Sequence, residues 1–176
     1  MEITRQTEVY TTAIDGPLVV QLWHHVTSVE GVDCLSAAIA NQLRVHKGVY
    51  VLHVTMTTKA PDSQARERIN QLTTRYAQRT RASALVFEGG GFGAATVRAV
   101  VAGISMITPY PFPYKVFAHV STAVDWLGTL PKEPGSDEAF ARTQTEIDRM
   151  RVIYANHYKS IRPDGKGGRA SSRAAR

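Results

Sequence analysis

The run Val49-Tyr-Val-Leu-His-Val-Thr-Met56 is the stretch that decides the fold. It is almost continuously apolar and rich in β-branched residues, which is typical of a strand buried on both faces. A second run of this kind, Ala82-Ser-Ala-Leu-Val-Phe87, follows a segment with helical spacing. Strands that alternate with helices form a mostly parallel sheet, because parallel neighbours need a crossover connection. The sequence therefore predicts an α/β fold.

The segments on either side of these two strands extend the predicted sheet. Two β-rich runs, Glu8–Ile14 and Leu18–His24, flank Asp15 and Gly16, a dipeptide typical of a tight hairpin turn. A last strand is expected at Tyr114–Val120. We expect about five strands, with an antiparallel hairpin at the N-terminal side and helices flanking the sheet.

Four further segments of the first 131 residues carry start signals or apolar residues at helical spacing. The pattern Thr27-Ser-Val-Glu30 reads as a capping box, in which Thr27 caps the helix and Glu30 reaches back to the cap. The expected helices run from Thr27 to about Val45, from Asp62 or Ser63 to about Tyr76, from Val97 to Ile107, and over a short segment capped by Ser121.

The C-terminal part is predicted to add one long helix and a tail to an α/β domain of residues 1–131. A linker rich in proline and glycine opens residues 132–161, which form an amphipathic helix starting near Ser136. Its apolar stripe lies on its own domain, pairs with a second copy, or contacts another protein. We expect a homodimer that becomes monomeric when the chain is cut at Pro131. The stripe includes Phe140, Ile147, Met150 and Tyr154.

The distribution of charge and the cysteine content indicate which partners and which cellular compartment to expect. The net charge is +6, and residues 162–176, which we predict to be disordered, hold five basic residues and one acid. The remainder is nearly neutral, so nucleic-acid binding is expected only through this tail. The single cysteine, Cys34, forms no internal disulfide, and neither a signal peptide nor a long apolar span is present. A cytoplasmic protein is expected.

A glycine-rich turn after the second buried strand is a candidate site for a small ligand or anion. The turn consists of Gly89, Gly90, Gly91, Phe92 and Gly93, followed by Ala94, and fits a dinucleotide-binding pattern. No acidic residue ends the next strand to hold a ribose, and no Walker lysine follows. We therefore favour a tight turn that brings helix and sheet together, and we expect no cofactor.

No arrangement typical of catalysis or metal binding is found in the sequence. His24 and His25 are neighbours on a predicted strand, so their side chains point to opposite faces. His53 and His119 have no acid or cysteine beside them, and Cys34 lies inside a predicted helix. We expect a protein that is not an enzyme and that holds no metal.

Two groups of side chains are candidate partner contacts. Arg68, Arg75 and Arg79 form a stripe beside the apolar face of the second predicted helix. Their stems can cover the edge of the core, and an anionic partner is the alternative. Tyr110 and Phe112 lie in a proline-rich loop, where they either contact a partner or pack into the core.

The element order and two local sequences resemble bacterial STAS-like, SpoIIAA-like domains. The two sequences are Phe87-Glu-Gly-Gly-Gly-Phe-Gly-Ala-Ala-Thr-Val-Arg98 and Val116-Phe-Ala-His-Val-Ser-Thr-Ala-Val-Asp-Trp-Leu127. The resemblance covers about residues 8–127. It implies a regulatory or scaffold domain that works through protein contacts, although related domains bind nucleotides or lipids.

The resemblance also singles out one serine. In the anti-sigma-factor antagonists of this family, a kinase phosphorylates the serine of an Asp-Ser-x-Gly motif at the start of a helix. Asp62 and Ser63 occupy the matching place here, with Ala65 in place of the glycine. Ser63 is thus a candidate phosphorylation site, and a helix cap is the alternative interpretation.

Overall fold

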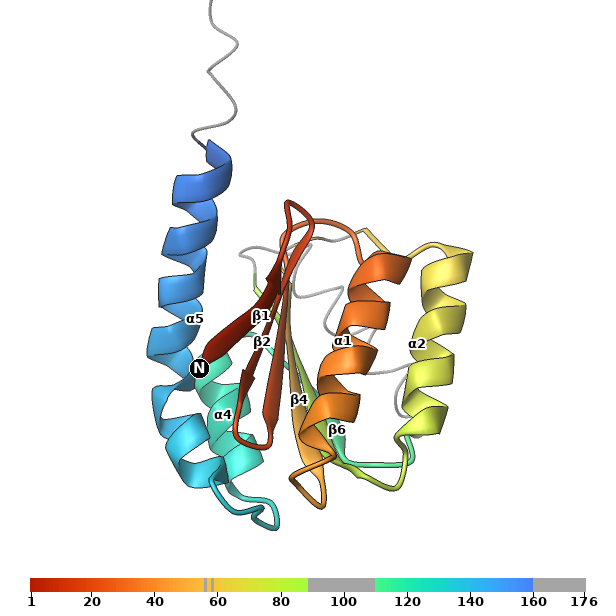
Figure 1. The fold of residues 1–176 in the computed structure, drawn as a ribbon, viewed down its shortest axis with the longest axis vertical. Helices are drawn as coiled ribbons and strands as arrows, with labels where there is room; N and C mark the ends of the chain where they lie inside the picture. Colours follow the sequence, from red (N-terminus) through yellow and green to blue (C-terminus); the bar gives the residue numbers. More distant parts are fainter. Residues whose placement is uncertain (56, 58, 89–109, 160–176) are drawn as a thin grey trace, which may run out of the picture.

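The computed structural model describes residues 1–55, 57, 59–88 and 110–159, and within them the strands form one sheet (Figure 1). The strands lie side by side in chain order. Each of the first three is antiparallel to its neighbour among them, and each later strand is parallel to its predecessor. The strands are β1 (Glu2–Gln6), β2 (Tyr10–Asp15), β3 (Leu18–Trp23), β4 (Val49–Thr55), β5 (Thr80–Phe87) and β6 (Tyr114–Phe117).

The predicted α/β fold with its N-terminal hairpin is confirmed, and the described sheet has one strand more than expected. Gly16, at the hairpin turn between β2 and β3, has a φ of 53°, a conformation that glycine adopts without strain. The additional strand is β1, which pairs with β2 at the edge of the sheet. It was not predicted because its side chains are mostly exposed and Ile3 is its only apolar residue.

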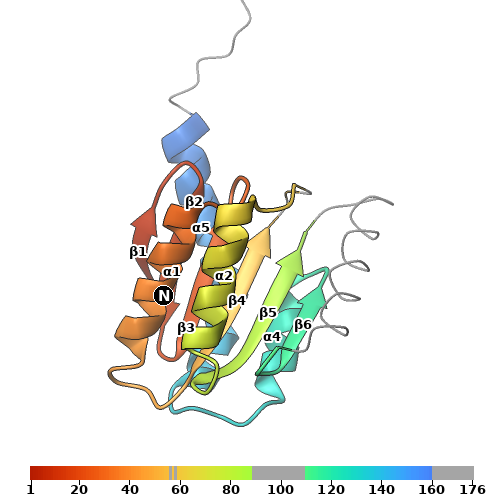
Figure 2. The ribbon, with the colours of Figure 1, turned by 90° about the vertical axis from the view of Figure 1, so that its right-hand side faces the viewer.

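Helices cover both faces of the sheet. Helices α1 (Val29–Gln42) and α2 (Ser63–Arg75) lie on one face, and α4 (Val120–Gly128) and α5 (Ser136–Lys159) lie on the other (Figure 1). Seen from the side of α1 and α2, strands β5 and β6 extend beyond α2 (Figure 2). The helix predicted from Val97 to Ile107 lies outside the described residues.

The caps of three helices test the predicted start signals. Asp62 caps α2, since its carboxylate accepts a hydrogen bond of 2.8 Å from the backbone N–H of Ala65. The cap of α1 is Ser28, one residue beyond the predicted Thr27. The prediction for α4 was also displaced, because Ser121 lies within that helix and His119 takes the cap position.

Helix α5 packs on the domain that precedes it. The exposed fractions of Phe140, Ile147 and Met150 are 5%, 0% and 1%, and all three join the core cluster of β3, β4 and β5. The ring of Phe140 meets that of Tyr50 edge-on at 5.1 Å between centroids. These three side chains are therefore covered within the chain and are not accessible to a partner. A homodimer stays a prediction and has to use other residues.

Polar contacts fix α5 along its length. Near its start, the guanidinium of Arg142 pairs with Asp15 of β2, and this contact holds the pKa of the buried Asp15 carboxyl below its ordinary value. Further along, Arg151 pairs with Glu88, directly after β5. The hydroxyl of Tyr154 donates a hydrogen bond of 2.9 Å to the backbone carbonyl of Glu8. Helix α5 is thus an integral layer of the fold.

Candidate functional site

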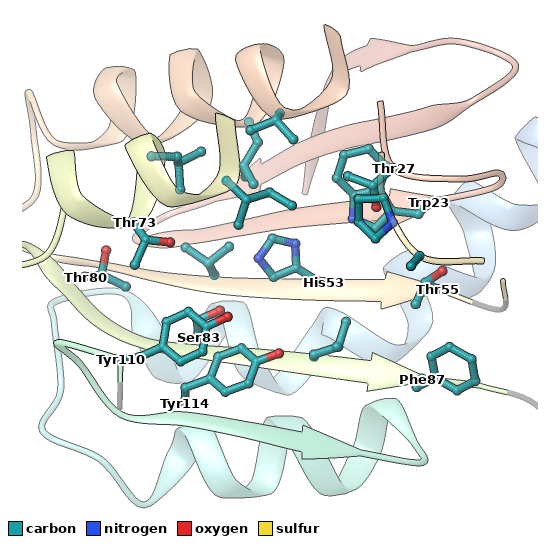
Figure 3. A pocket seen from close by; sticks show the side chains of 18 of the residues that line it. Trp23, Thr27, His53, Thr55, Thr73, Thr80, Ser83, Phe87, Tyr110 and Tyr114 are labelled. Atoms are coloured by element: carbon teal, nitrogen blue, oxygen red, sulfur yellow. The ribbon is translucent and has the colours of Figure 1, made fainter. Parts of the chain in front are cut away.

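A cavity of about 490 Å³ lies between α2 and the face of strands β4, β5 and β6 (Figure 3). This volume is in the range of sites that hold small molecules. Its walls combine aliphatic side chains of the helices and strands with aromatic rings at both ends. We call it the cavity throughout.

The side chains of β5 point alternately to the two faces of the sheet, and this alternation determines which of them line the cavity. Ala82, Ala84 and Val86 point to the opposite face and are fully buried in the core beneath α4. The intervening side chains of Ser83, Leu85 and Phe87 point into the cavity. Helix α2 lines the cavity with the half-buried Ile69 and Leu72, and its only fully buried residue is Ala65. The helix therefore covers the strands incompletely.

Trp23, at the end of β3, forms one end of the cavity and is held in place by α1. Its exposed fraction is 6%, and its ring lies 6.1 Å from that of Tyr10 between centroids. The ring packs against Gly31 so closely that a Cβ atom at Gly31 would lie 2.5 Å from it. A side chain at that position would force the indole to move. The absence of one at Gly31 thus sets the position of this wall.

Three aromatic residues form the opposite end, next to β6. The rings of Tyr110 and Tyr114 stack with 4.2 Å between centroids, and Phe112 lies 5.8 Å from Tyr110. Burial raises the pKa of both tyrosine hydroxyls, so both are neutral at physiological pH. The sequence left open whether Tyr110 and Phe112 contact a partner or pack into the core. In the structure both line the cavity.

His53 projects from the middle of β4 into the cavity (Figure 3). Burial lowers the pKa of its imidazole from 6.5 to about 4. The ring is therefore neutral at physiological pH, with one nitrogen as donor and the other as acceptor. The sequence analysis considered His53 only as a metal ligand and did not identify this position.

The rim of the cavity lies where the chain leaves β4. There the hydroxyl of Thr55 accepts a hydrogen bond of 3.3 Å from the backbone N–H of Thr57. The hydroxyl of Thr57 accepts one of 3.2 Å from the backbone N–H of Lys59. The exposed Lys59 is the charged side chain among the described residues that line the cavity. Charge is thus confined to the rim.

The three predicted arginine contacts have different surroundings. Arg68 is exposed and pairs with Asp33 of α1 at 3.2 Å. Arg75 is exposed in the last turn of α2. Arg79 lies beyond the end of α2 and donates hydrogen bonds of 2.8, 2.8 and 3.2 Å to the carbonyls of Leu43, His46 and Lys47. Arg79 therefore caps the end of α1, which corrects its assignment to the stripe on α2.

The remaining predicted site residues do not join the cavity. Ser63 is the exposed first residue of α2, and Asp62 makes the cap hydrogen bond. Tyr154 stacks on His24 with 3.5 Å between ring centroids. The turn from Gly89 to Gly93 lies outside the described residues.

Two searches of the described residues gave negative results. No group of three or more histidine, cysteine, aspartate or glutamate side chains lies close enough to hold a metal ion in residues 1–55, 57, 59–88 and 110–159. Over the same ranges, no helix has the length and apolar character needed to cross a membrane.

Sequence reasoning missed His53, Ser83 and Tyr114 as members of one site. The signal was present in β4 and β5, where the polar residues His53 and Ser83 interrupt apolar runs. The strand register places Ser83 beside Tyr114 on β6 and two residue pairs along from His53 on β4. That register was needed before the two interruptions could be connected.

The chain matches no protein-family model and no curated protein. Among solved structures, it is similar to an uncharacterised protein of the DUF3478 family from Shewanella loihica, described as having a SpoIIAA-like fold. The similarity covers 67% of this chain and 91% of that one, with 12% sequence identity and a TM-score of 0.49. The description of that protein uses the same fold name as the sequence resemblance.

Proposed function

We propose that the protein is a non-enzymatic binding module that takes a small, largely apolar molecule into the cavity. The observation that carries this proposal is the cavity itself, about 490 Å³ lined mainly by apolar side chains on a sheet whose other face carries a continuous buried core. Removing the apolar surface of a ligand from water would supply the affinity. The polar side chains among the walls would orient the ligand.

The surfaces that the sequence offered for protein binding support a partner less well. Phe140, Ile147 and Met150 are core residues, and Arg79 is engaged in capping α1. Regulation through a protein partner stays a prediction, to which Arg75 and Ser63 on the exposed side of α2 remain available. A ligand in the cavity would contact the other side of the same helix.

Binding of the neutral dye Nile red, whose emission rises in apolar surroundings, tests the proposal. Thr73 of α2 lines the cavity, and a Thr73→Phe substitution would place a ring in this space. The next residue, Thr74, is exposed, so Thr74→Phe is the matched control. We expect saturable binding at one site, weakened about tenfold by Thr73→Phe, which corresponds to ~1.4 kcal/mol. Thr74→Phe should leave the affinity as it is.

Two results would contradict this function. One is the absence of saturable dye binding by the folded full-length chain. The other is an equal effect of the two substitutions, which would place the dye outside the cavity. Unfolding curves of both variants show whether either substitution acts through loss of the fold instead.

A further inference from the structure

Three polar side chains form a row across three neighbouring strands on the cavity face. Ser83 of β5 is paired in register with Tyr114 of β6. His53 of β4 is paired with Leu85, two residues beyond Ser83 on the same face. Ser83 and Tyr114 lie on neighbouring strands about 4.8 Å apart, and His53 lies on the strand at the other side of Ser83, two residues further along, so all three can face the same ligand. Figure 3 shows Ser83 near the rings of Tyr110 and Tyr114, with His53 on the adjoining strand.

The row differs from Thr80 and from the threonines of the rim in its hydrogen bonding. The hydroxyl of Thr80 donates to the carbonyl of Tyr76 at 3.0 Å, and the threonines of the rim accept backbone hydrogen bonds. Within the described residues, the side chains of His53, Ser83 and Tyr114 make no hydrogen bond. Polar groups in an apolar site are costly unless they find partners. The row therefore offers free donors and acceptors to whatever fills the cavity.

The row also carries no charge. Its members are a serine hydroxyl, a phenol and an imidazole that burial keeps neutral. An anionic group placed among them would lose its hydration without gaining an opposite charge, which is strongly unfavourable. Lys59, which could pair with an anion, lies at the rim beyond Thr57. The cavity thus separates an uncharged polar interior from a charged edge.

From this arrangement, and building on the proposed function, we infer that the ligand is an apolar molecule with one uncharged hydrogen-bonding group, a hydroxyl or a carbonyl, seated on His53, Ser83 and Tyr114. The apolar part lies along Ile69, Leu72 and Leu85. The row acts as the specificity determinant, because a ligand that satisfies its donors and acceptors binds with higher affinity.

Competition against Nile red with three probes of equal chain length tests this inference. Decanol carries a hydroxyl, decyl fluoride replaces it with a group that hydrogen-bonds poorly, and decanoate replaces it with a charge. We expect decanol to bind about tenfold more tightly than decyl fluoride and decanoate to bind most weakly. Ser83→Ala and Tyr114→Phe should each reduce the ratio of decanol to decyl fluoride affinity severalfold. Tyr158→Phe, which removes a tyrosine hydroxyl from α5, is the matched control and should keep the ratio.

The outcomes separate this inference from the proposed function. Binding of all three probes with an unchanged ratio in Ser83→Ala and Tyr114→Phe would show that the row does not recognise the ligand, while the cavity still binds. Tightest binding of decanoate, lost in Lys59→Ala, would mean that an anion at the rim is recognised instead. If neither the dye nor any probe binds, the proposed function fails, and this inference fails with it.

Discussion

The two faces of the sheet differ in how completely the described helices cover them. On the face of α4 and α5, Leu52, Leu127 and Ile147 are fully buried in one continuous cluster. On the face of α1 and α2, the described side chains pack densely over β3 and the start of β4, and Leu85 of β5 is half-buried. One face thus supplies stability, and the other keeps space with free polar groups. Residues on the face of α4 and α5 thus stabilise the fold, and residues on the cavity face are able to contact a ligand.

The largest expected difference between the faces concerns the loss of aliphatic side chains. Ile147→Ala should lower the free energy of unfolding by about 4 kcal/mol, because it opens a void in a fully packed core. Leu85→Ala should cost only about 1 kcal/mol, since Leu85 already borders empty space. Urea unfolding of both variants measures the difference. Equal losses would mean that the two faces are packed equally well.

A smaller effect on stability is expected from pH, because one histidine lies next to α5 and another lies in the cavity. Burial lowers the pKa of both His24, which stacks on Tyr154 of α5, and His53, in the cavity, from 6.5 to about 4. The unfolded chain binds more protons between these values, so stability falls as the pH drops from about 6.5 towards 4. Each histidine should contribute roughly 1 kcal/mol of this loss between about pH 7 and pH 5.5.

Two substitutions assign the pH dependence to its sources. His24→Phe keeps an aromatic ring next to Tyr154, and His53→Leu keeps an apolar side chain on β4. Each should remove part of the change in unfolding free energy between the two pH values. A dependence that stays the same in both variants would show that neither histidine is responsible.

The smallest effect distinguishes two adjacent residues at the start of α2. Asp62→Ala should cost about 1 kcal/mol, because the carboxylate accepts the cap hydrogen bond from Ala65. Ser63→Ala should change stability by less than about 0.5 kcal/mol, since Ser63 is exposed and does not cap the helix. Thermal unfolding of both variants checks this. A larger loss for Ser63→Ala would make Ser63 part of the cap.

The buried strands were predictable from sequence because continuous apolar runs have few alternatives to burial on both faces. Strand β1 was not, since an exposed edge strand such as this has no regular alternation around Ile3. The predicted start of α1 was wrong by one residue, because Thr27 and Ser28 are both good caps and only the packing of the helix decides between them. Local sequence thus predicts element type better than it predicts element ends.

The cavity could not be predicted from sequence because its walls come together only through tertiary packing. Trp23 and Tyr114 form its two ends although 91 residues separate them in the chain. Its size depends on how α2 is placed over β5, which no local pattern encodes. The polar residues His53 and Ser83 were visible within apolar strands, and they remain the one sequence signal that pointed to this face.

Methyl-selective NMR of the full chain during titration with Nile red tests the central claim most directly. Methyl resonances of Ile69, Leu72 and Leu85 should shift and saturate with the affinity measured by fluorescence, because these side chains line the cavity. Those of Leu52 and Ile147, in the packed core of the other face, should remain at their positions. Shifts confined to the packed face, or no saturable shift at all, would contradict the assignment of binding to the cavity.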